Sequence, residues 1–373
     1  MRRFVTLFLI LFSIFLINGE TISPKGLKVK FDERIELMSI ICHLAGYPEY
    51  NMRLGGEYIN EIDNYFSDYK NHQAVLMMDS LRRKNGVAYD SPMAFAINLQ
   101  KNDDRFIIVN DTIIPERRWQ GVDLKKATDI INDFYKESDF SNFIELHKPF
   151  YEDICNLFDE NVNSKFNQDW YYRFYGMPAL DDFEIVIGFT NGGSSYGPSV
   201  NKTKDSRELY AIIGYALNNN GESYFESDPD IYLNNLVHEF NHSFVNPLAK
   251  NPKYKAEIEK AGNELLTLTK KAMSKGAYSN GQTIINESLV RAAVILYLID
   301  NNIGEKEIRK SIIEEMSSGF YWMPEMVKCL QYYKNNRDTF PTFESYYPII
   351  IEFFKNFSNN RTEKIDSILA DTK

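Results

Sequence analysis

The sequence has few cysteines, and they are not arranged as pairs. Cys42, Cys155 and Cys329 are the three cysteines among 373 residues, and no CxxC occurs. An odd number excludes complete pairing, so at most one disulfide can form, and only in an oxidising compartment. We expect the three thiols to act as small buried apolar side chains.

The sequence also lacks long basic runs, internal repeats and low-complexity linkers. It has 52 acidic and 42 basic residues, a formal net charge of −10 and a pI near 5.2. Nucleic acid binding requires clustered Lys and Arg, so we expect no nucleic acid partner. Because 44% of the residues are hydrophobic, the chain can bury a large core, and we predict one compact catalytic unit with a helical N-terminal portion packed on it.

A long apolar run occurs at the N-terminus. Arg2 and Arg3 precede the apolar run Phe4–Ile17. This run is shorter than the roughly 20 residues of a membrane span but suits the core of a signal peptide, about 7–15 residues. We therefore predict that residues 1–19 are a signal peptide and that the protein is exported, periplasmic or extracellular, without a membrane segment after cleavage. An uncleaved signal anchor is the alternative.

The rest of the chain predicts an α+β fold that is mostly helical. Residues 20–178 form a mainly helical N-terminal portion, residues 179–358 a catalytic portion, and residues 359–373 a polar tail. Apolar residues spaced three and four apart predict helices, whereas β-branched and aromatic runs bounded by turn residues predict strands. Helices are expected at 32–50, 55–69, 123–140, 228–245, 256–277, 282–300, 305–320, 324–334 and 343–357. Strands are expected at 183–190 and 208–217, and a strand or a piece of a hairpin at 106–114.

One short stretch carries chemistry, "LVHEFNHSFVNP" at 236–247. His238 and His242 are four residues apart and flank Glu239. On a helix these two histidines lie on one face, about 5–6 Å apart at Cβ, and two imidazoles so placed suit a divalent metal, most often zinc. A neighbouring carboxylate can then deprotonate a metal-bound water.

The motif is predicted to lie on a well-defined helix. Asp228 is a plausible N-cap and Pro229 the first helical residue, and Asn246-Pro247 is expected to end the helix. Four apolar residues at helical spacing form the expected buried stripe: Leu233, Val237, Phe240 and Phe244.

A zinc site of this kind needs a third protein ligand. The metzincin pattern is excluded because Val245 and Leu248 stand where Gly and His are required, and no histidine follows His242. A carboxylate on a later helix is the simplest alternative. We favour Glu287, because its helix is apolar almost all round and an unpaired buried carboxylate is costly. The charged helix around Glu264 offers this second candidate an easy solvated face.

The segments "HEFNH" and "NESLVRA" together resemble the gluzincin zinc metallopeptidases. More narrowly, residues 181–354 resemble an uncharacterised group of exported bacterial zincin-like proteins, the domain-of-unknown-function family 4932. The resemblance implies a zincin-like metallopeptidase fold with a small twisted β-sheet next to the HExxH helix. It also implies Zn²⁺ as cofactor, His238, His242 and Glu287 as ligands, and Glu239 as general base. Arg291 stands where thermolysin-like enzymes place an aspartate.

Hydrolysis of a peptide bond also needs an electrophile for the oxyanion and a surface that holds the substrate. No further histidine is present for the first role, and the candidates are Tyr278, Tyr321, Tyr333, Tyr346 and Arg291. Zincins bind their peptide along an edge strand, for which "FEIVIGFTNGGSSYG" is the candidate here, with Gly192 and Gly193 allowing close backbone approach. An ordinary strand and turn is the competing interpretation.

Three classes of function remain open from the sequence. The favoured one is an exported zinc-dependent metallopeptidase acting on a peptide or protein substrate. The second is a catalytically inactive zincin-fold protein that binds a metal or a partner, and the third is a helical binding protein whose HExxH is accidental.

Overall fold

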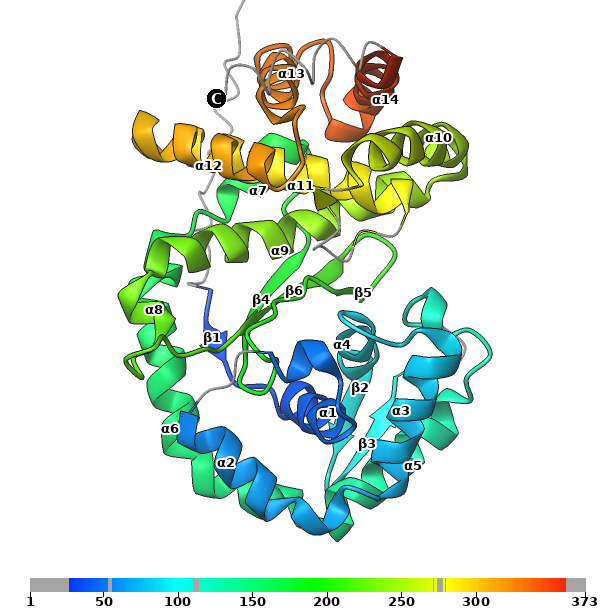
Figure 1. Cartoon of the computed structure of the whole chain (residues 1–373), viewed down its shortest axis with the longest axis vertical. Coiled ribbons are helices and arrows are strands. Elements are labelled where there is room, and N and C mark those ends of the chain that lie inside the picture. Colours follow the sequence, from blue (N-terminus) through cyan, green and yellow to red (C-terminus); the bar gives the residue numbers. More distant parts are fainter. Residues whose placement is uncertain are drawn as a thin grey trace, which may run out of the picture.

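The protein has an α+β architecture built around one small mixed sheet. The computed structural model describes residues 27–52, 56–109, 114–270, 272–273, 278 and 280–359. The expected signal peptide at residues 1–19 lies outside them, as does nearly all of the expected tail. The helices lie in layers on both faces of the sheet (Figure 1).

The sheet has four strands in the order β1-β4-β6-β5. Strands β4 (Asp182–Gly188) and β6 (Arg207–Gly214) confirm the two strands expected there, and they pair in parallel over their length. β1 (Val29–Lys30) adds parallel to β4, and β5 (Ser199–Asn201) adds antiparallel to β6 at the other edge. These two short strands were not predicted, because two or three residues carry no alternation that a sequence pattern can detect. A separate hairpin joins β2 (Leu99–Asn102) and β3 (Arg105–Ile108).

Helices account for most of the remaining residues. The N-terminal portion holds α1 (Glu33–Leu44), α2 (Gly56–Tyr65), α3 (Gln73–Asn85), α4 (Ser91–Ala96), α5 (Leu124–Glu137), α6 (Phe140–Asn161) and α7 (Asp169–Tyr175). The C-terminal portion holds α8 (Tyr224–Ser227), α9 (Pro229–Lys250), α10 (Pro252–Thr269), α11 (Gly281–Asp300), α12 (Glu305–Ser317), α13 (Met323–Asn335) and α14 (Phe343–Asn359).

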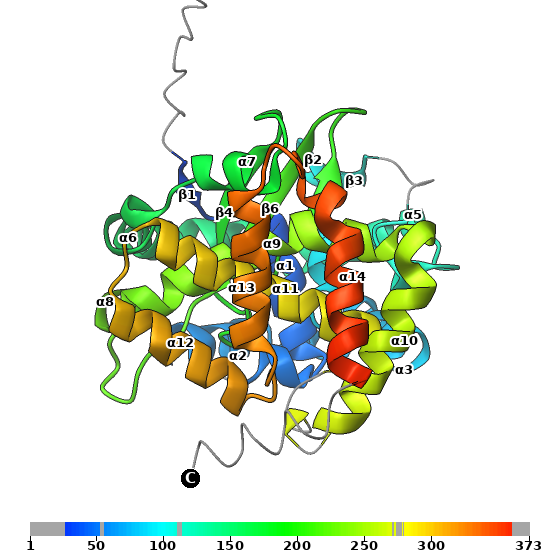
Figure 2. The same cartoon turned by 90° about the horizontal axis from the view of Figure 1, so that it is seen from above.

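The layers determine where the histidine helix lies. α9 packs against β6 on one face of the sheet, and α11 packs on the far side of α9 (Figure 1). α13 and α14 then cover α10 and α11, as the view from above shows (Figure 2). On the opposite face of the sheet lie α1, α4 and the β2–β3 hairpin. α9 is therefore held between a sheet and a second helix, which limits its freedom to move.

The expected buried stripe on α9 is confirmed. Leu233, Val237, Phe240 and Phe244 are all buried, and Pro229 is the first helical residue. Asp228 occupies the N-cap position, but its side chain makes no capping hydrogen bond.

The predicted end of this helix at Asn246-Pro247 is wrong, because α9 continues to Lys250. A proline inside a helix leaves the carbonyl four residues earlier without its usual donor. Here that carbonyl belongs to Ser243, and it accepts a hydrogen bond of 2.6 Å from Nη1 of Arg207. The lost helical bond is thus replaced by a contact from β6, which allows the helix to pass through Pro247.

α11 is the most apolar helix near the histidines. Its length and composition would suffice to cross a membrane, a property shared by core helices of soluble proteins, and 67% of its apolar window is buried within the structure. Its N-terminal end approaches α10 closely at Gly262 and Gly281. A Cβ on Gly281 would lie 2.3 Å from the backbone nitrogen of Asn263, so only glycine permits this crossing.

Candidate metal centre

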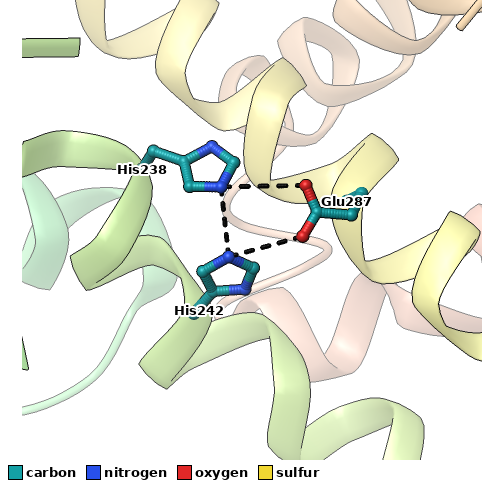
Figure 3. Close-up of side chains that lie close together, drawn as sticks. All are labelled: His238, His242 and Glu287. Carbon is teal, nitrogen blue, oxygen red and sulfur yellow. Dashed lines mark hydrogen bonds and ion pairs between the residues drawn. The ribbon is translucent and has the colours of Figure 1, made fainter. Parts of the chain in front are cut away.

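His238 and His242 project from successive turns of α9 toward α11 (Figure 3). Their side chains are 19% and 16% exposed, between the buried stripe and the open cleft. The Nε2 atoms of the two rings are 3.1 Å apart. The spacing of four residues therefore does place both imidazoles at one point.

Glu287 reaches the same point from α11, as the burial argument predicted. Its side chain is only 14% exposed, with Oε1 3.5 Å from Nε2 of His242 and Oε2 3.7 Å from Nε2 of His238. One potential ligand atom from each of the three residues lies within 4.8 Å of the others. Glu264, the second candidate, lies on α10 and is not part of this group.

These distances fit a single small cation. Zinc bonds of about 2.0–2.1 Å in tetrahedral geometry place neighbouring ligand atoms roughly 3.4 Å apart. The three observed separations, 3.1, 3.5 and 3.7 Å, bracket that value. A set of two imidazoles and one carboxylate is also a common donor set of catalytic zinc sites, which keep the fourth position open.

Two of the three candidate ligands, His242 and Glu287, are oriented by a neighbouring side chain. Nδ1 of His242 lies 3.4 Å from Oδ1 of Asn246, a contact that leaves Nε2 free to bind a metal if Nδ1 carries the proton. Arg291, one turn after Glu287 on α11, donates from Nε to Oε2 of Glu287 at 3.2 Å. Arg291 thus forms an ion pair with Glu287 and orients its carboxylate.

Arg291 is itself held by a residue that the sequence did not single out. Nη1 donates to both carboxylate oxygens of Glu315 on α12, at 3.0 and 2.8 Å, and Nη2 donates to the hydroxyl of Tyr278 at 3.0 Å. Glu315 is one of several glutamates on a charged helix, so no sequence signal distinguished it. Only the packing of α12 against α11 brings it to Arg291.

The surroundings of His238 favour its neutral form, and the surroundings of Glu239 favour its protonated form. Burial lowers the pKa of His238 well below its ordinary value, and His242 and Arg291 lower it further. Burial also raises the pKa of Glu239 well above its ordinary value, with Glu287 and Asp90 adding to the effect. A neutral imidazole is the form that binds a metal. A glutamate with a raised pKa is a better proton acceptor near neutral pH.

Glu239 and His238 lie where two pockets meet. The larger, about 970 Å³, is also lined by His242, Glu287 and Tyr278. The smaller, about 330 Å³, is also lined by Arg291, Asn234 and Glu315. The site is thus accessible to a ligand from two sides.

The five candidates for stabilising the oxyanion differ in where their side chains lie relative to the two pockets. Tyr278 and Arg291 line these two pockets. Tyr333 and Tyr346 are buried, and their hydroxyls donate to the backbone carbonyls of Phe174 and Cys329 respectively. Tyr321 is not among the described residues that line either pocket.

The predicted substrate-binding segment, residues 183–197, reaches an edge of the sheet only with its last residues. β4, which contains residues 183–188 of this segment, lies between β1 and β6 and has no free edge. The edge near the site begins with the last residues of this segment, since Tyr196 bridges to Ile212 of β6 and β5 continues the same pairing. Gly197 there packs directly on α9, where a Cβ would lie 2.1 Å from the carbonyl oxygen of Glu239. Gly193 does line the smaller pocket.

The cysteines contribute nothing to the site. Cys42 and Cys155 are buried, Cys329 is partly buried, and all three are free thiols.

Comparisons with known proteins place the chain in one family. No curated protein and no solved structure is significantly similar to it. A family model described as a domain of unknown function, DUF4932, matches residues 27–353, which include β1, the whole sheet and the three candidate ligands. The chain therefore belongs to the DUF4932 family.

Proposed function

We propose that the protein is an exported zinc metallopeptidase of gluzincin type, with a zincin-like catalytic portion. The observation that carries the proposal is the convergence of His238, His242 and Glu287 from two helices, with Glu239 beside them at the junction of two pockets. Zinc held by these three side chains would lower the pKa of a bound water and polarise a substrate carbonyl.

Glu239 has the position and environment of the general base. It is 8% exposed, borders both pockets and has a raised pKa, so it can accept a proton from water near neutral pH. The same carboxyl can then donate that proton to the leaving amine, which completes the hydrolysis of an amide bond.

Tyr278 is the best-supported donor to the oxyanion. Its hydroxyl accepts a hydrogen bond from Arg291, so its own proton is available to a negatively charged oxygen. Burial raises its pKa, which keeps the hydroxyl protonated. Arg291 is less suited, because it is already engaged by Glu287, Glu315 and Tyr278.

The free edge of the sheet supports a peptide as the substrate. Backbone groups along an edge strand can pair with an extended chain, whose main-chain hydrogen bonds do not depend on its sequence. Ser195, Tyr196 and Gly197 of this edge line the larger pocket together with the candidate ligands.

The test combines metal analysis with a matched pair of variants. Purified protein should contain one zinc per chain, and it should hydrolyse an unstructured protein such as β-casein. Glu239→Gln should retain the zinc and lose hydrolysis by a factor of at least about 100, the lower end of what a general base contributes. Zinc without any hydrolysis would instead identify a zincin-fold binding protein, and absence of zinc would make the HExxH accidental.

A further inference from the structure

Another pocket, which we call the second pocket, is lined by stretches of two chain segments that neighbour those lining the larger pocket at the candidate metal centre. The pocket at the metal centre is lined by residues 195–197 of the sheet edge and by residues 116–118 opposite. The second pocket, about 1120 Å³, is lined by residues 199–201 of the same edge and by Ile114 and Pro115 opposite. Neighbouring stretches of the same two chain segments, residues 195–201 and 114–118, thus line the two pockets, and the segments run in opposite directions from one pocket to the other.

The sheet edge that borders these two pockets has free backbone groups. Tyr196 exchanges both backbone hydrogen bonds with Ile212, and the carbonyl of Pro198 accepts from Tyr210. Because backbone groups alternate in direction along an antiparallel strand, those of Ser195, Gly197 and Ser199 point away from β6. They form a row that an extended chain can use from the metal centre into the second pocket.

The charges of the second pocket are largely neutralised within the protein. Arg34 pairs with Asp32 at 2.6 Å, and Lys101 pairs with Glu33 at 2.7 Å. The other two bases, Lys30 and Lys202, pair with Glu184 at 2.6 Å and with Glu208 at 3.0 Å respectively. A charged substrate group would have to compete with these ion pairs.

Apolar side chains complete the pocket and are exposed to solvent there. Val109 is 64% exposed and Ile114 is 47% exposed, and Phe31 and Val200 also contribute to the lining. Exposed apolar surface of this kind gains free energy when an apolar ligand covers it.

We propose, building on the peptidase function above, that this pocket is a remote subsite that binds an apolar side chain of an extended polypeptide substrate. Residues 197 and 201 are separated by four residues of strand, about 13 Å at roughly 3.3 Å per residue. The recognised side chain therefore lies about four residues from the bond that is cleaved. The substrate class is long, unfolded polypeptides with an apolar residue at that distance, and short peptides cannot reach the subsite.

The experiment uses zinc-loaded Glu239→Gln, so that binding is measured without turnover. The probes are fluorescein-labelled decapeptides of Gly, Ser and Ala in which a single Leu is moved along the chain, with fluorescence anisotropy as the readout. Affinity should peak at one Leu position, by about tenfold over the all-small peptide, as expected for covering one aliphatic side chain. Wild-type protein with the same peptides, followed by mass spectrometry, locates the cleaved bond relative to that Leu.

Variants of exposed apolar residues test whether the second pocket binds the Leu side chain. Ile114→Asp and Val109→Asp should abolish the dependence on Leu position, whereas Ile114→Leu should keep it. Leu146→Asp is the matched control, because Leu146 is 65% exposed on α6 and lines neither pocket. It should behave like the parent protein.

The outcomes distinguish this subsite from the proposed function. Affinity that does not depend on Leu position, or that depends on it equally in Ile114→Asp, would overturn the subsite. Cleavage in wild type without any Leu preference would do the same while leaving the peptidase function in place. Leu-dependent binding without cleavage by wild type would support the subsite and contradict the peptidase function.

Discussion

Glu287, the candidate third ligand, shows how much the surroundings of a single residue indicate about its role. Glu287 lies on a helix whose other residues are mostly apolar, and its carboxylate contacts Arg291 and approaches both histidines. A buried carboxylate needs such partners, since an unpaired charge there would cost several kcal/mol.

Exchanging this carboxylate for an amide tests its role as a ligand. Glu287→Gln should lower zinc affinity by at least about tenfold, the smaller end of what changes around a metal ligand cost. Competition with a chromogenic chelator measures the affinity. Glu264→Gln, the matched change on α10, should bind zinc like wild type. The reverse ranking would transfer the ligand role to Glu264 and leave Glu287 as the partner of Arg291.

A second buried carboxyl, Glu36 on α1, lies away from the metal centre. Its Oε1 accepts from the hydroxyls of Tyr58, at 2.7 Å, and Thr190, whereas Oε2 is buried without a hydrogen-bond partner among the residues that the structure describes. Burial raises its pKa from 4.5 to about 7. Thr190 directly follows the β4 region, so this carboxyl helps to attach α1 to the loop that leads to the sheet edge.

The titration of Glu36 should be visible in the stability of the protein. The folded state holds the proton more tightly than the unfolded state, so this group's contribution is full below pH 4.5 and is lost as pH rises through about 7. Glu36→Gln stays neutral and should lack this loss. Above pH 7 the variant should therefore exceed wild type in the free energy of unfolding by up to about 3 kcal/mol, measured by urea denaturation. The exposed Glu160→Gln is the control, and an unchanged pH slope in Glu36→Gln would refute the expectation.

At the scale of elements, the geometry of the candidate metal centre depends on how α11 crosses its neighbours. α11 packs on both α9 and α10, and the crossing with α10 is closest at Gly262 and Gly281. Asn241 of α9 also donates from its amide to the carbonyl of Val290 at 3.4 Å, and Trp322 donates to the hydroxyl of Ser288 at 2.8 Å. These contacts set the position of Glu287 relative to the histidines.

A methyl group at the crossing should disturb both stability and metal binding. In Gly281→Ala the new Cβ would meet backbone atoms of Gly262 and Asn263, which cannot yield unless the start of α11 moves. We expect a loss of about 1–3 kcal/mol in the free energy of unfolding and weaker zinc binding. Gly304→Ala is the control, because its Cβ would meet only the flexible carboxylate of Glu307, and it should cost less than about 1 kcal/mol. Equal effects of the two variants would contradict this role of the crossing.

At the scale of the whole molecule, the metal would join two helices that belong to different layers. His238 and His242 lie on α9 next to the sheet, whereas Glu287 lies on α11 beneath α13 (Figures 1 and 3). A ligand that binds only the folded state stabilises it by mass action.

Zinc should therefore raise the Tm of the protein. At a concentration of about 100 times its Kd, zinc should stabilise the fold by about 2.7 kcal/mol, which corresponds to several degrees in Tm. Differential scanning fluorimetry of protein treated with EDTA and then titrated with zinc measures the shift. His238→Ala should show no such shift, and an identical shift in that variant would show that zinc acts elsewhere.

The export of the whole molecule is a separate prediction. Mass spectrometry of protein from its native host should find an N-terminus near Glu20, because the signal peptide is removed on export. Membrane-bound protein that retains Met1 would identify a signal anchor instead.

The features that the sequence alone determined are those that depend on interactions between residues close together in the chain. The helical period with its buried stripe on α9, the two long strands β4 and β6, and the joint position of His238 and His242 all follow from short-range spacing. Glu287 was identified from the sequence because burial of a charge is costly wherever the helix lies, although its distance to the histidines could not be derived.

Tertiary packing decided the rest. Pro247 does not end α9, because Arg207 from a distant strand replaces the missing hydrogen bond. Glu315 supports Arg291 only because α12 packs beside α11, and the free edge belongs to β5, which is too short to produce a pattern. The two pockets beside the sheet edge require residues 114–118 and 195–201, which are far apart in the chain, to come together. Each of these features depends on contacts between residues far apart in the chain, whose geometry no local periodicity encodes.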